Sequence, residues 1–414
     1  MTTRRQLLQG TAATAAFFAA PPFLRTAAAD APKLKPLPPG QRLQTPKFDA
    51  LGPGRRYAAG VRPHRSGGVR LSLEAPVDTP KGRKFFIHNY GHSGAGITLS
   101  WGCASHVVSH VETAMNQLAA ANIRPSVAVL GTGVIGLTTA TELRRKWSRL
   151  PITVYAKSLD VRTTTSFIAG GQFEPSQIFR EYESDAGKVV LADYLRRSAA
   201  RITELQNSGR REDFGVALRR NYTFDDPQEG FDDFTPRDVV AAPRRMKLPF
   251  EKLNANGREY ITWLMNPQIL LPTLVRELKG GGVLFEARKF TSEQQIRHEL
   301  AQTIIVNCTG FGAKELFGDP ALKPRRGHLV ILKNPAELKY FFSGGCTNNV
   351  ISYMFARQND IVIGGTVNRN ENETRDFFDA TDPNDKKICD RLFDNARLVF
   401  GGKPDDCVAP PTPT

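Results

Sequence analysis

A glycine-rich turn between an apolar run and a helix-like run is the sequence feature that most constrains the fold. The stretch "SVAVLGTGVIGLTTATEL" places Gly131, Gly133 and Gly136 in the order Gly-x-Gly-x-x-Gly. The small apolar residues before the turn predict a buried strand, and the residues after it predict a helix. The first glycine allows the tight turn, the second lets a pyrophosphate approach backbone N–H groups, and the third permits close helix packing. The pattern therefore predicts a parallel α/β fold with a dinucleotide site; a strand–helix turn without a ligand is the alternative.

The strand expected next, "PITVYAK", departs from the dinucleotide pattern at its end. An acidic residue is expected there to accept the ribose hydroxyls. Lys157 occupies the position instead. Either the ribose is contacted in another way, or the lysine lies near the phosphates.

Three other segments point to the same ligand. Residues 162–176, "RTTTSFIAGGQFEPS", offer hydroxyls and a glycine turn, and "TIIVNCTG" reads as a short buried strand that ends in Thr309 and Gly310. The third, "KFFIHNYGHSGAGITLSWGCA", carries Gly91, Gly94 and Gly96 after a strand-like run. Two glycine-rich approaches predict one elongated ligand that is held from two sides.

Together with "GVRPHRSGGVRLSLE" at residues 60–74, these segments resemble the D-amino-acid oxidase family of flavoproteins, over most of the chain from about 55 to 400. The resemblance implies a Rossmann-like FAD-binding domain with a doubly wound parallel sheet, and a substrate domain with a mixed or antiparallel sheet. It implies FAD as the cofactor. The residues that it assigns to the cofactor are Gly131, Thr132, Gly133, Val134, Ile135, Gly136, Lys157, Thr163, Thr164, Thr165, Gly170, Gly171, Phe290, Thr309, Ser93, Gly94, Gly96, Ile97 and Thr98.

The reaction that the resemblance implies is the oxidative deamination of D-amino acids. A hydride leaves Cα for flavin N5, the reduced flavin passes two electrons to oxygen, and the products are a 2-oxo acid, ammonia and hydrogen peroxide. No acid–base residue is required. Arg62 matches the arginine that clamps the substrate carboxylate, Tyr353 matches a tyrosine that assists it, and Gly94 is expected to accept a hydrogen bond from the substrate amine. A second, lid tyrosine is replaced by Asn349 or is differently aligned.

Two other functions remain open at this stage. An oxidase that prefers acidic D-amino acids, of the D-aspartate type, would need further basic residues in the pocket. From another class, the chain could be a non-catalytic flavoprotein or a dehydrogenase that makes no peroxide. The resemblance also allows a homodimer.

The order of the segments differs from that of the family. The arginine segment and the His-Asn-Tyr-Gly signature come last in the family, whereas here they precede the dinucleotide turn. We therefore expect a circular permutation in which residues 105–125 join the old ends and the region around Val408 lies near Leu51–Tyr57. We expect residues 1–29 to be a signal peptide, 30–54 a lead-in and 408–414 a tail. The substrate domain should comprise residues 55–83, 176–282 and 331–407, and the FAD-binding domain residues 84–175 and 283–330.

The charge, histidine and cysteine patterns indicate no further ligand or partner. The formal charge of +15 favours anionic partners, but the basic residues occur in scattered pairs without a nucleic-acid-binding motif, so no nucleic-acid partner is expected. The histidine pairs His88/His92 and His106/His110 lack a metal-site context, and His88 is read as a turn residue near the flavin. Of five cysteines, Cys346, Cys389 and Cys407 allow one bridge without specifying it.

The N-terminal region has the pattern of a targeting signal. "TTRRQLL" carries Arg4 and Arg5 before an alanine-rich stretch and the small residues "AAAD". This predicts a twin-arginine signal over residues 1–29 and a periplasmic or secreted protein, with a disordered basic N-terminus as the alternative. The apolar stretch is too short to span a bilayer, so no stable membrane span is expected.

Overall fold

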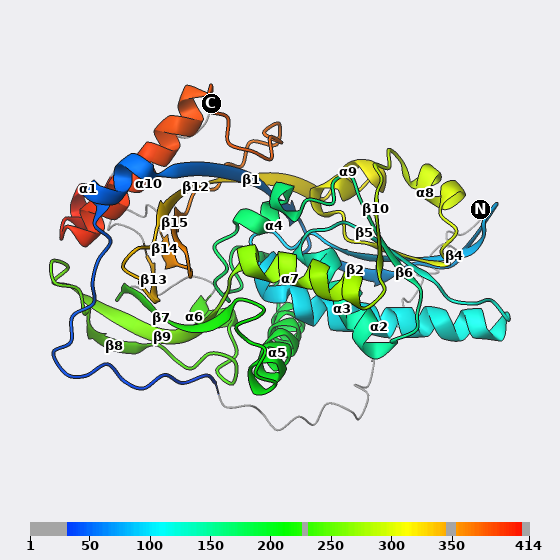
Figure 1. Ribbon diagram of the computed structural model, residues 1–414, viewed down its shortest axis with the longest axis horizontal. Coiled ribbons are helices and arrows are strands. Elements are labelled where there is room, and N and C mark those ends of the chain that lie inside the picture. Colours follow the sequence, from blue (N-terminus) through cyan, green and yellow to red (C-terminus); the bar gives the residue numbers. More distant parts are fainter. Residues whose placement is uncertain (1–30, 226–230, 345–352, 408–414) are drawn as a thin grey trace, which may run out of the picture.

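Two β-sheets lie side by side, each with its own apolar core, in the computed structural model (Figure 1). The structure describes residues 31–225, 231–344 and 353–407. One sheet has seven strands and the other eight. The two-sheet α/β fold expected from the sequence is confirmed.

The seven-stranded sheet contains the dinucleotide turn. Its order is β10-β6-β5-β11-β4-β2, with β3 paired to β4, and the first five strands run parallel. Its central strands β5 and β11 are buried at every residue, as in parallel sheets covered on both faces. The strands are β2 (Arg70–Leu73), β3 (Val77–Thr79), β4 (Gly82–Tyr90), β5 (Val127–Leu130), β6 (Ile152–Ala156), β10 (Leu284–Ala287) and β11 (Ile304–Asn307).

The eight-stranded sheet is mixed and mostly antiparallel. Its order is β1-β12-β15-β14-β13-β7-β9-β8, and β13 with β7 is its one parallel pair. The strands are β1 (Arg56–Arg65), β7 (Val216–Phe224), β8 (Arg244–Lys247), β9 (Asn256–Met265), β12 (Leu322–Lys333), β13 (Tyr340–Ser343), β14 (Tyr353–Ala356) and β15 (Asp360–Gly364).

The helices cover these sheets and connect them. The α-helices are α1 (Phe48–Leu51), α2 (Gly96–Ala120), α3 (Val134–Lys146), α4 (Thr165–Ile168), α5 (Asp185–Asn207), α6 (Phe231–Phe234), α7 (Pro267–Gly280), α8 (Glu293–Glu299), α9 (Ala313–Leu316) and α10 (Pro383–Phe400). The 3₁₀ turns are η1 (Gly52–Gly54), η2 (Val161–Thr163), η3 (Ile178–Glu181), η4 (Gly310–Gly312) and η5 (Pro404–Asp406).

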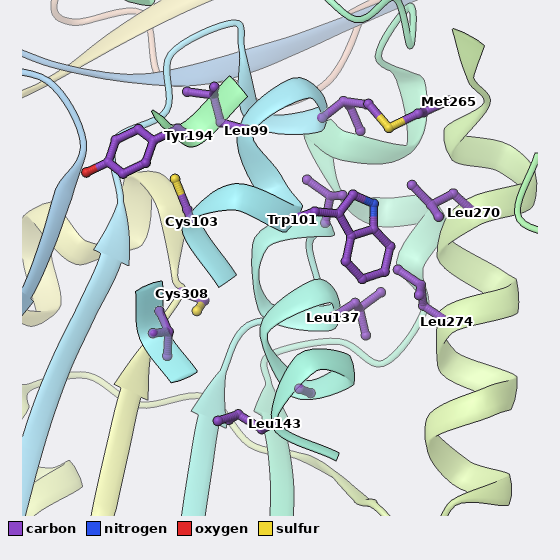
Figure 2. Close-up of a cluster of buried hydrophobic side chains, with 14 of the residues drawn as sticks. Leu99, Trp101, Cys103, Leu137, Leu143, Tyr194, Met265, Leu270, Leu274 and Cys308 are labelled. Atoms are coloured by element: carbon purple, nitrogen blue, oxygen red, sulfur yellow. The ribbon is translucent and has the colours of Figure 1, made fainter. Parts of the chain in front are cut away.

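The larger core lies where α2, α3, α5 and α7 pack beneath the seven-stranded sheet (Figures 1 and 2). Trp101 of α2 lies among leucines of α3 and α7. A Cβ at Gly102 would lie 2.1 Å from the Tyr194 carbonyl oxygen of α5, so only glycine allows α2 and α5 to cross this closely. The position of α2 matters because its first turn reaches the candidate site.

The second core lies between α10 and one face of the eight-stranded sheet. The beginning of the described chain joins this core, because the Phe48 ring lies 5.7 Å from Phe393 and Arg55 Nη2 lies 3.0 Å from Asp390 Oδ1. Cys407 is buried in the same cluster. Val408, to which the permutation prediction referred, lies outside the described residues.

The predicted join at 105–125 falls in the C-terminal part of α2 and the short loop that leads into β5. The expected domain pieces are distributed over both sheets: within 55–83, β1 lies in the eight-stranded sheet, while β2 and β3 lie in the other. Within 283–330, β10 and β11 lie in the seven-stranded sheet and β12 in the eight-stranded one. The domain boundaries stay a prediction.

Candidate active site

The carboxyl ends of the five parallel strands meet at one edge of the sheet, and a predicted cofactor residue follows each of them. In α/β folds this edge is where ligands bind. The residues are Ser93 after β4, Gly131 after β5, Lys157 after β6, Phe290 after β10 and Thr309 after β11. The topology therefore brings together segments that are about 200 residues apart in the chain.

The dinucleotide turn has the close backbone packing that its glycines predict. Gly131 has φ 116°, and a Cβ there would lie 2.5 Å from the Cys308 carbonyl oxygen at the end of β11. A Cβ at Gly136 would lie 2.0 Å from the Gly131 carbonyl oxygen. The turn thus leads directly into α3, whose N-cap residue, Gly133, has no capping side chain. An uncapped helix start favours an anionic ligand such as a phosphate.

Of the other residues of this turn, some make hydrogen bonds to the protein and others form the first turn of α3. Thr132 donates its hydroxyl hydrogen to the Ser158 carbonyl oxygen at 3.1 Å. Val134 donates its backbone N–H to Ser166 Oγ at 3.1 Å, while Ile135 is partly exposed in the first turn of α3. Ser166 is a contact that the sequence analysis missed.

The second glycine-rich segment forms the start of α2 and reaches the first one. A Cβ at Gly96 would lie 3.9 Å from Val134 Cγ1, so α2 and α3 begin next to each other. Ser93 has φ 51° and donates its backbone N–H to the Pro63 carbonyl oxygen of β1 at 3.0 Å. Ile97 is buried in the first turn of α2, whose N-cap residue also has no capping side chain. The two approaches that the sequence predicted for one elongated ligand are therefore adjacent.

A buried polar atom in this segment, His92 Nε2, is suited to contact a bound ligand. Within the described residues, His92 Nε2 is buried without a hydrogen-bond partner. Burial also lowers the pKa of His92 to about 3, so its ring is neutral. Together with the two uncapped helix starts and the Gly131 turn, this orphan atom fits a bound flavin dinucleotide.

The threonine and glycine residues of 163–171 are occupied with protein contacts. The hydroxyls of Thr163 and Thr164 donate to the carbonyl oxygens of Asp160 and Val161, and Thr165 Oγ1 donates to Asp376 Oδ1 at 2.7 Å. A Cβ at Gly170 would lie 2.6 Å from Phe355, and one at Gly171 would lie 2.5 Å from the Met265 carbonyl oxygen. These glycines are required for packing against the eight-stranded sheet; their cofactor role stays a prediction.

Lys157 occupies the position where an acidic residue was expected, and the acidic residue Asp376 lies within electrostatic reach of it. Burial raises the pKa of Asp376, while the positive charge of Lys157 acts in the opposite direction. Asp376 Oδ1 also accepts the Val61 backbone N–H of β1 at 2.8 Å. Phe290 packs edge-on against Tyr155 at 5.9 Å, and Thr309 Oγ1 donates to Asn307 Oδ1 at 2.7 Å.

The two side chains that the sequence assigned to the substrate converge from different strands. Burial raises the pKa of Tyr353, and the positive charge of Arg62 close to it partly offsets this. Arg62 Nη1 also donates to the Thr366 carbonyl oxygen at 3.0 Å. Arg62 comes from β1 and Tyr353 from β14, with β12 and β15 between them.

Both side chains lie over glycines of the intervening strands. A Cβ at Gly327 of β12 would lie 2.5 Å from Arg62 Nη2, and one at Gly364 of β15 would lie 2.4 Å from Tyr353 Cζ. Sequence analysis missed this pair. Glycine inside a strand often marks close approach by another group, and "RRGHLVIL" and "IVIGGT" each contain that signal.

Gly94 joins this pair, so all three predicted substrate residues lie together. A Cβ at Gly94 would lie 3.6 Å from Arg62 Cδ and 3.1 Å from Ser176 Oγ. The turn that carries Gly94 is the same one that begins α2. The candidate carboxylate clamp therefore lies next to the candidate flavin turn. Asn349 lies outside the described residues.

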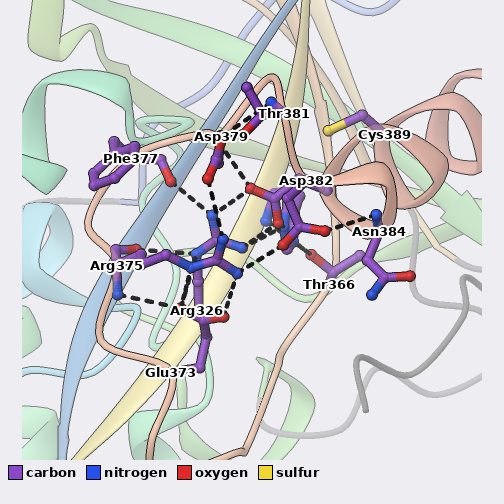
Figure 3. Close-up of polar contacts among 12 residues, drawn as sticks. Arg326, Thr366, Glu373, Arg375, Phe377, Asp379, Thr381, Asp382, Asn384 and Cys389 are labelled. Carbon is purple, nitrogen blue, oxygen red and sulfur yellow. Dashed lines mark hydrogen bonds and ion pairs between the residues drawn. The ribbon is translucent and has the colours of Figure 1, made fainter.

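A buried arginine network holds the loop that follows β15 against this site (Figure 3). Arg326 of β12 donates from Nη2 to Asp385 Oδ2 at 2.6 Å and to the Phe377 carbonyl oxygen at 2.6 Å. It also donates from Nε to the Arg375 carbonyl oxygen at 2.9 Å. Asp376, which contacts β1, lies between those two carbonyls. This network is another feature that the sequence pattern did not indicate.

The expectation that His88 lies in a turn is wrong, whereas its expected position near the flavin stays a prediction. His88 is buried within β4, because that strand continues to Tyr90. Its Nε2 lies 2.9 Å from Glu74 Oε1, and its Nδ1 lies 3.1 Å from Asn307 Nδ2. Among the described residues, no group of three or more His, Cys, Asp or Glu side chains is arranged to hold a metal ion.

Part of the chain is similar to a protein-family model and to known proteins. Residues 126–411 match the model of the FAD dependent oxidoreductase family. The chain is 30% identical over 254 residues to a D-amino-acid oxidase of Streptomyces coelicolor, which covers 58% of this chain and 69% of that protein. It is 24% identical over 252 residues to human D-aspartate oxidase, covering 58% of this chain and 68% of that protein. Among solved structures, iminodiacetate oxidase from Chelativorans sp. BNC1 aligns with a TM-score of 0.48 and 14% identity, over 68% of this chain and 80% of that one.

The chain therefore belongs to the FAD-dependent oxidoreductase family, with a D-amino-acid oxidase and a D-aspartate oxidase among its relatives. Its cofactor is FAD. The residues of the two glycine-rich turns are those that would hold it.

Proposed function

We propose that this protein is an FAD-dependent oxidase of D-amino acids. The observation that carries the proposal is the convergence of Arg62 and Tyr353 beside Gly94, on the turn that begins α2. The 30% identity to a D-amino-acid oxidase over 254 residues supports the same reaction.

Each substrate residue has a defined task in this reaction. The planar guanidinium of Arg62 can bind the substrate carboxylate at two points. Because burial raises the pKa of Tyr353, its hydroxyl stays protonated and can donate to the same carboxylate. The Gly94 carbonyl oxygen would accept a hydrogen bond from the amine and fix the orientation of Cα.

When bound, FAD accepts the two electrons that leave Cα and transfers them to oxygen. The balanced reaction joins a D-amino acid, oxygen and water to give a 2-oxo acid, ammonia and hydrogen peroxide. The protein's contribution is to bind, orient and partly desolvate the substrate, so no acid–base residue is assigned.

Peroxide release by the purified FAD-loaded protein tests the proposal. We expect one peroxide and one ammonia for each 2-oxo acid with D-amino acids and no turnover of L-isomers. Turnover of L-isomers alone would overturn the stereochemical claim. Reduction of a dye with no peroxide would support the dehydrogenase alternative instead.

We also propose that the fold is a circular permutation of the family fold. Three contacts support this: β4 pairs in parallel with β11, α2 leads directly from β4 into β5, and residues 48–57 pack against α10. The family match also begins at residue 126, immediately before β5.

We also propose that the protein is exported to the periplasm or secreted. Cys407 is disulfide-bonded, which suits an oxidising compartment, while Cys103, Cys308 and Cys389 are free. Within the described residues, no helix is both long enough and apolar enough to cross a membrane. A homodimer also remains a proposal, which light scattering of the purified protein would test.

A further inference from the structure

Within the described part of the chain, Glu174 is an acidic side chain near the substrate residues without a basic ion-pair partner. Glu174 follows the strand-like segment that pairs with β9 through Gln172 and Leu264. Its backbone is fixed on α2, because Glu174 N donates to Thr98 Oγ1 at 3.0 Å and Thr98 Oγ1 donates to the Glu174 carbonyl oxygen at 2.8 Å. The position of Glu174 is therefore tied to the turn that carries Gly94.

The groups that face the Glu174 carboxylate are two tyrosines. Its charge acts on Tyr353 from β14 and on Tyr260 from β9. Burial alone raises the pKa of Glu174, and no lysine, arginine or histidine of the described residues pairs with it. The charge of Arg62 lowers the pKa of Tyr353 and the charge of Glu174 raises it, so Glu174 lies within electrostatic reach of the same tyrosine as Arg62.

Other unpaired acceptors occur beside it. Gln172 is two residues earlier in the extended segment, and its Oε1 is buried without a donor, while its Nε2 donates to Tyr260 Oη at 3.1 Å. Asn221, the cross-strand partner of Tyr260, also has a buried Oδ1 that accepts no hydrogen bond from any described residue. An anionic carboxylate with two amide oxygens nearby is suited to a ligand group that donates several hydrogen bonds and carries positive charge.

We propose that Glu174 selects D-amino acids with a cationic side chain, such as D-lysine, D-ornithine and D-arginine. The inference rests on the proposed function, because Arg62 must fix the carboxylate end of the substrate. The side-chain ammonium or guanidinium then supplies the counter-ion that Glu174 lacks. An acidic D-amino acid would place a second carboxylate against it, which disfavours the D-aspartate-type alternative.

The substitution E174Q tests this, with E183Q as the matched control on the exposed part of the same segment. Peroxide release is measured with D-arginine, D-lysine, neutral D-norleucine and D-glutamate. We expect the wild type and E183Q to have the highest kcat/KM for the cationic substrates. In E174Q, kcat/KM for D-arginine should fall about 10- to 100-fold, with little change for D-norleucine.

Equal losses for all substrates would overturn the proposal, because Glu174 would then act on the common part of the substrate or on folding. The same holds if wild-type protein oxidises D-norleucine as well as D-arginine. In that case the oxidase function stands and the selectivity inference fails.

A binding measurement separates this inference from the oxidase proposal. δ-Guanidinovalerate has the carboxylate and guanidinium but no α-amine, and hexanoate lacks the positive charge. δ-Guanidinovalerate should raise the Tm of the FAD-loaded wild type more than hexanoate does, and E174Q should lose the difference. If this holds while no D-amino acid is oxidised, the oxidase proposal falls and the cation site stands. Equal Tm shifts would contradict the cation site.

Discussion

At the residue scale, the carboxylate clamp depends on two side chains that lie over glycines. Arg62 and Tyr353 come from strands separated by β12 and β15, and Gly327 and Gly364 leave space for them. Replacing Arg62 with lysine keeps the charge but loses the planar two-point contact. Loss of one partner of a charged hydrogen-bonded pair costs about 2–5 kcal/mol, so kcat/KM of R62K should fall roughly 30- to 3000-fold.

The matched control is Arg325→Lys, the cross-strand neighbour of Arg62 on β12. This variant should keep its kcat/KM within about threefold, since among the described residues the Arg325 guanidinium donates to backbone carbonyl oxygens alone. Both variants should retain FAD. A colourless R62K protein would mean that Arg62 supports folding or the cofactor, and the clamp assignment would be wrong.

Also at the residue scale, the selectivity proposed for Glu174 predicts a pH dependence. Burial raises the pKa of Glu174 to about 7. Its side chain is therefore mostly neutral at pH about 6 and mostly charged at pH about 8. The ratio of kcat/KM for D-arginine to that for D-norleucine should rise over this range in the wild type and stay flat in E174Q. A ratio that is independent of pH in both proteins would contradict the charge assignment.

The same shift has a consequence for stability. A carboxyl group whose folded-state pKa is raised holds its proton in the folded protein after the unfolded chain has released it. The free energy of unfolding therefore decreases as pH rises from about 4.5 to about 7, by this group's contribution. A bound cationic side chain would offset that loss.

At the element scale, the Arg326 network connects β12, α10 and the loop between β15 and α10. Burial would raise the pKa of Asp385, but bonds from Arg326, the Asp379 backbone N–H and His328 outweigh it and hold that pKa well below its usual range. The pair therefore stabilises the fold above the usual carboxyl pKa, and this contribution is lost as pH falls toward the depressed one.

Asp385→Asn should lower the free energy of unfolding by about 3–5 kcal/mol, because it removes the nearer carboxylate from the buried Arg326 charge and leaves only Glu373, whose Oε1 lies 3.8 Å from Arg326 Nε. Glu371→Gln is the control: its ion pair with Lys323 is exposed and should contribute about 0–1 kcal/mol. Denaturant unfolding of both variants checks this. Equal effects would show that the buried network does not hold the loop.

The elements also show what sequence can predict. The strand and helix around Gly131, the strands β6 and β11, and the residues Arg62, Tyr353 and Gly94 followed from local pattern and resemblance, because those signals are contiguous in the chain. The supporting residues did not: Gly327, Gly364, Glu174 and Arg326 act through contacts between strands and loops far apart in sequence. His88 was misplaced because a short glycine-rich motif does not show where its strand ends.

At the scale of the whole molecule, the permutation proposal predicts that the chain can be reordered. A gene that starts at residue 126, runs to 407, continues through a short linker to 48 and ends at 125 restores the family order. Cys407 and Phe48 share one apolar cluster, so the linker bridges a short distance. The reordered protein should fold, bind FAD and keep its kcat/KM within about tenfold, since circular permutation at surface termini is tolerated.

A control chain opened inside α3, at Ala140, interrupts a helix that packs in the larger core and should fail to bind FAD. If the reordered protein is unfolded while the control folds, the permutation proposal is wrong. Spectroscopic FAD content and far-UV circular dichroism report both results.

The central claim is that this chain holds a D-amino acid against FAD through Arg62, Tyr353 and Gly94. Anaerobic mixing of the FAD-loaded protein with D-arginine, followed by the flavin absorbance, tests it most directly because oxygen and later steps are excluded. We predict rapid loss of the oxidised flavin absorbance with D-arginine, none with L-arginine, and a much slower loss in R62K. Bleaching by both enantiomers at equal rates, or by neither enantiomer nor any other D-amino acid, would contradict the account.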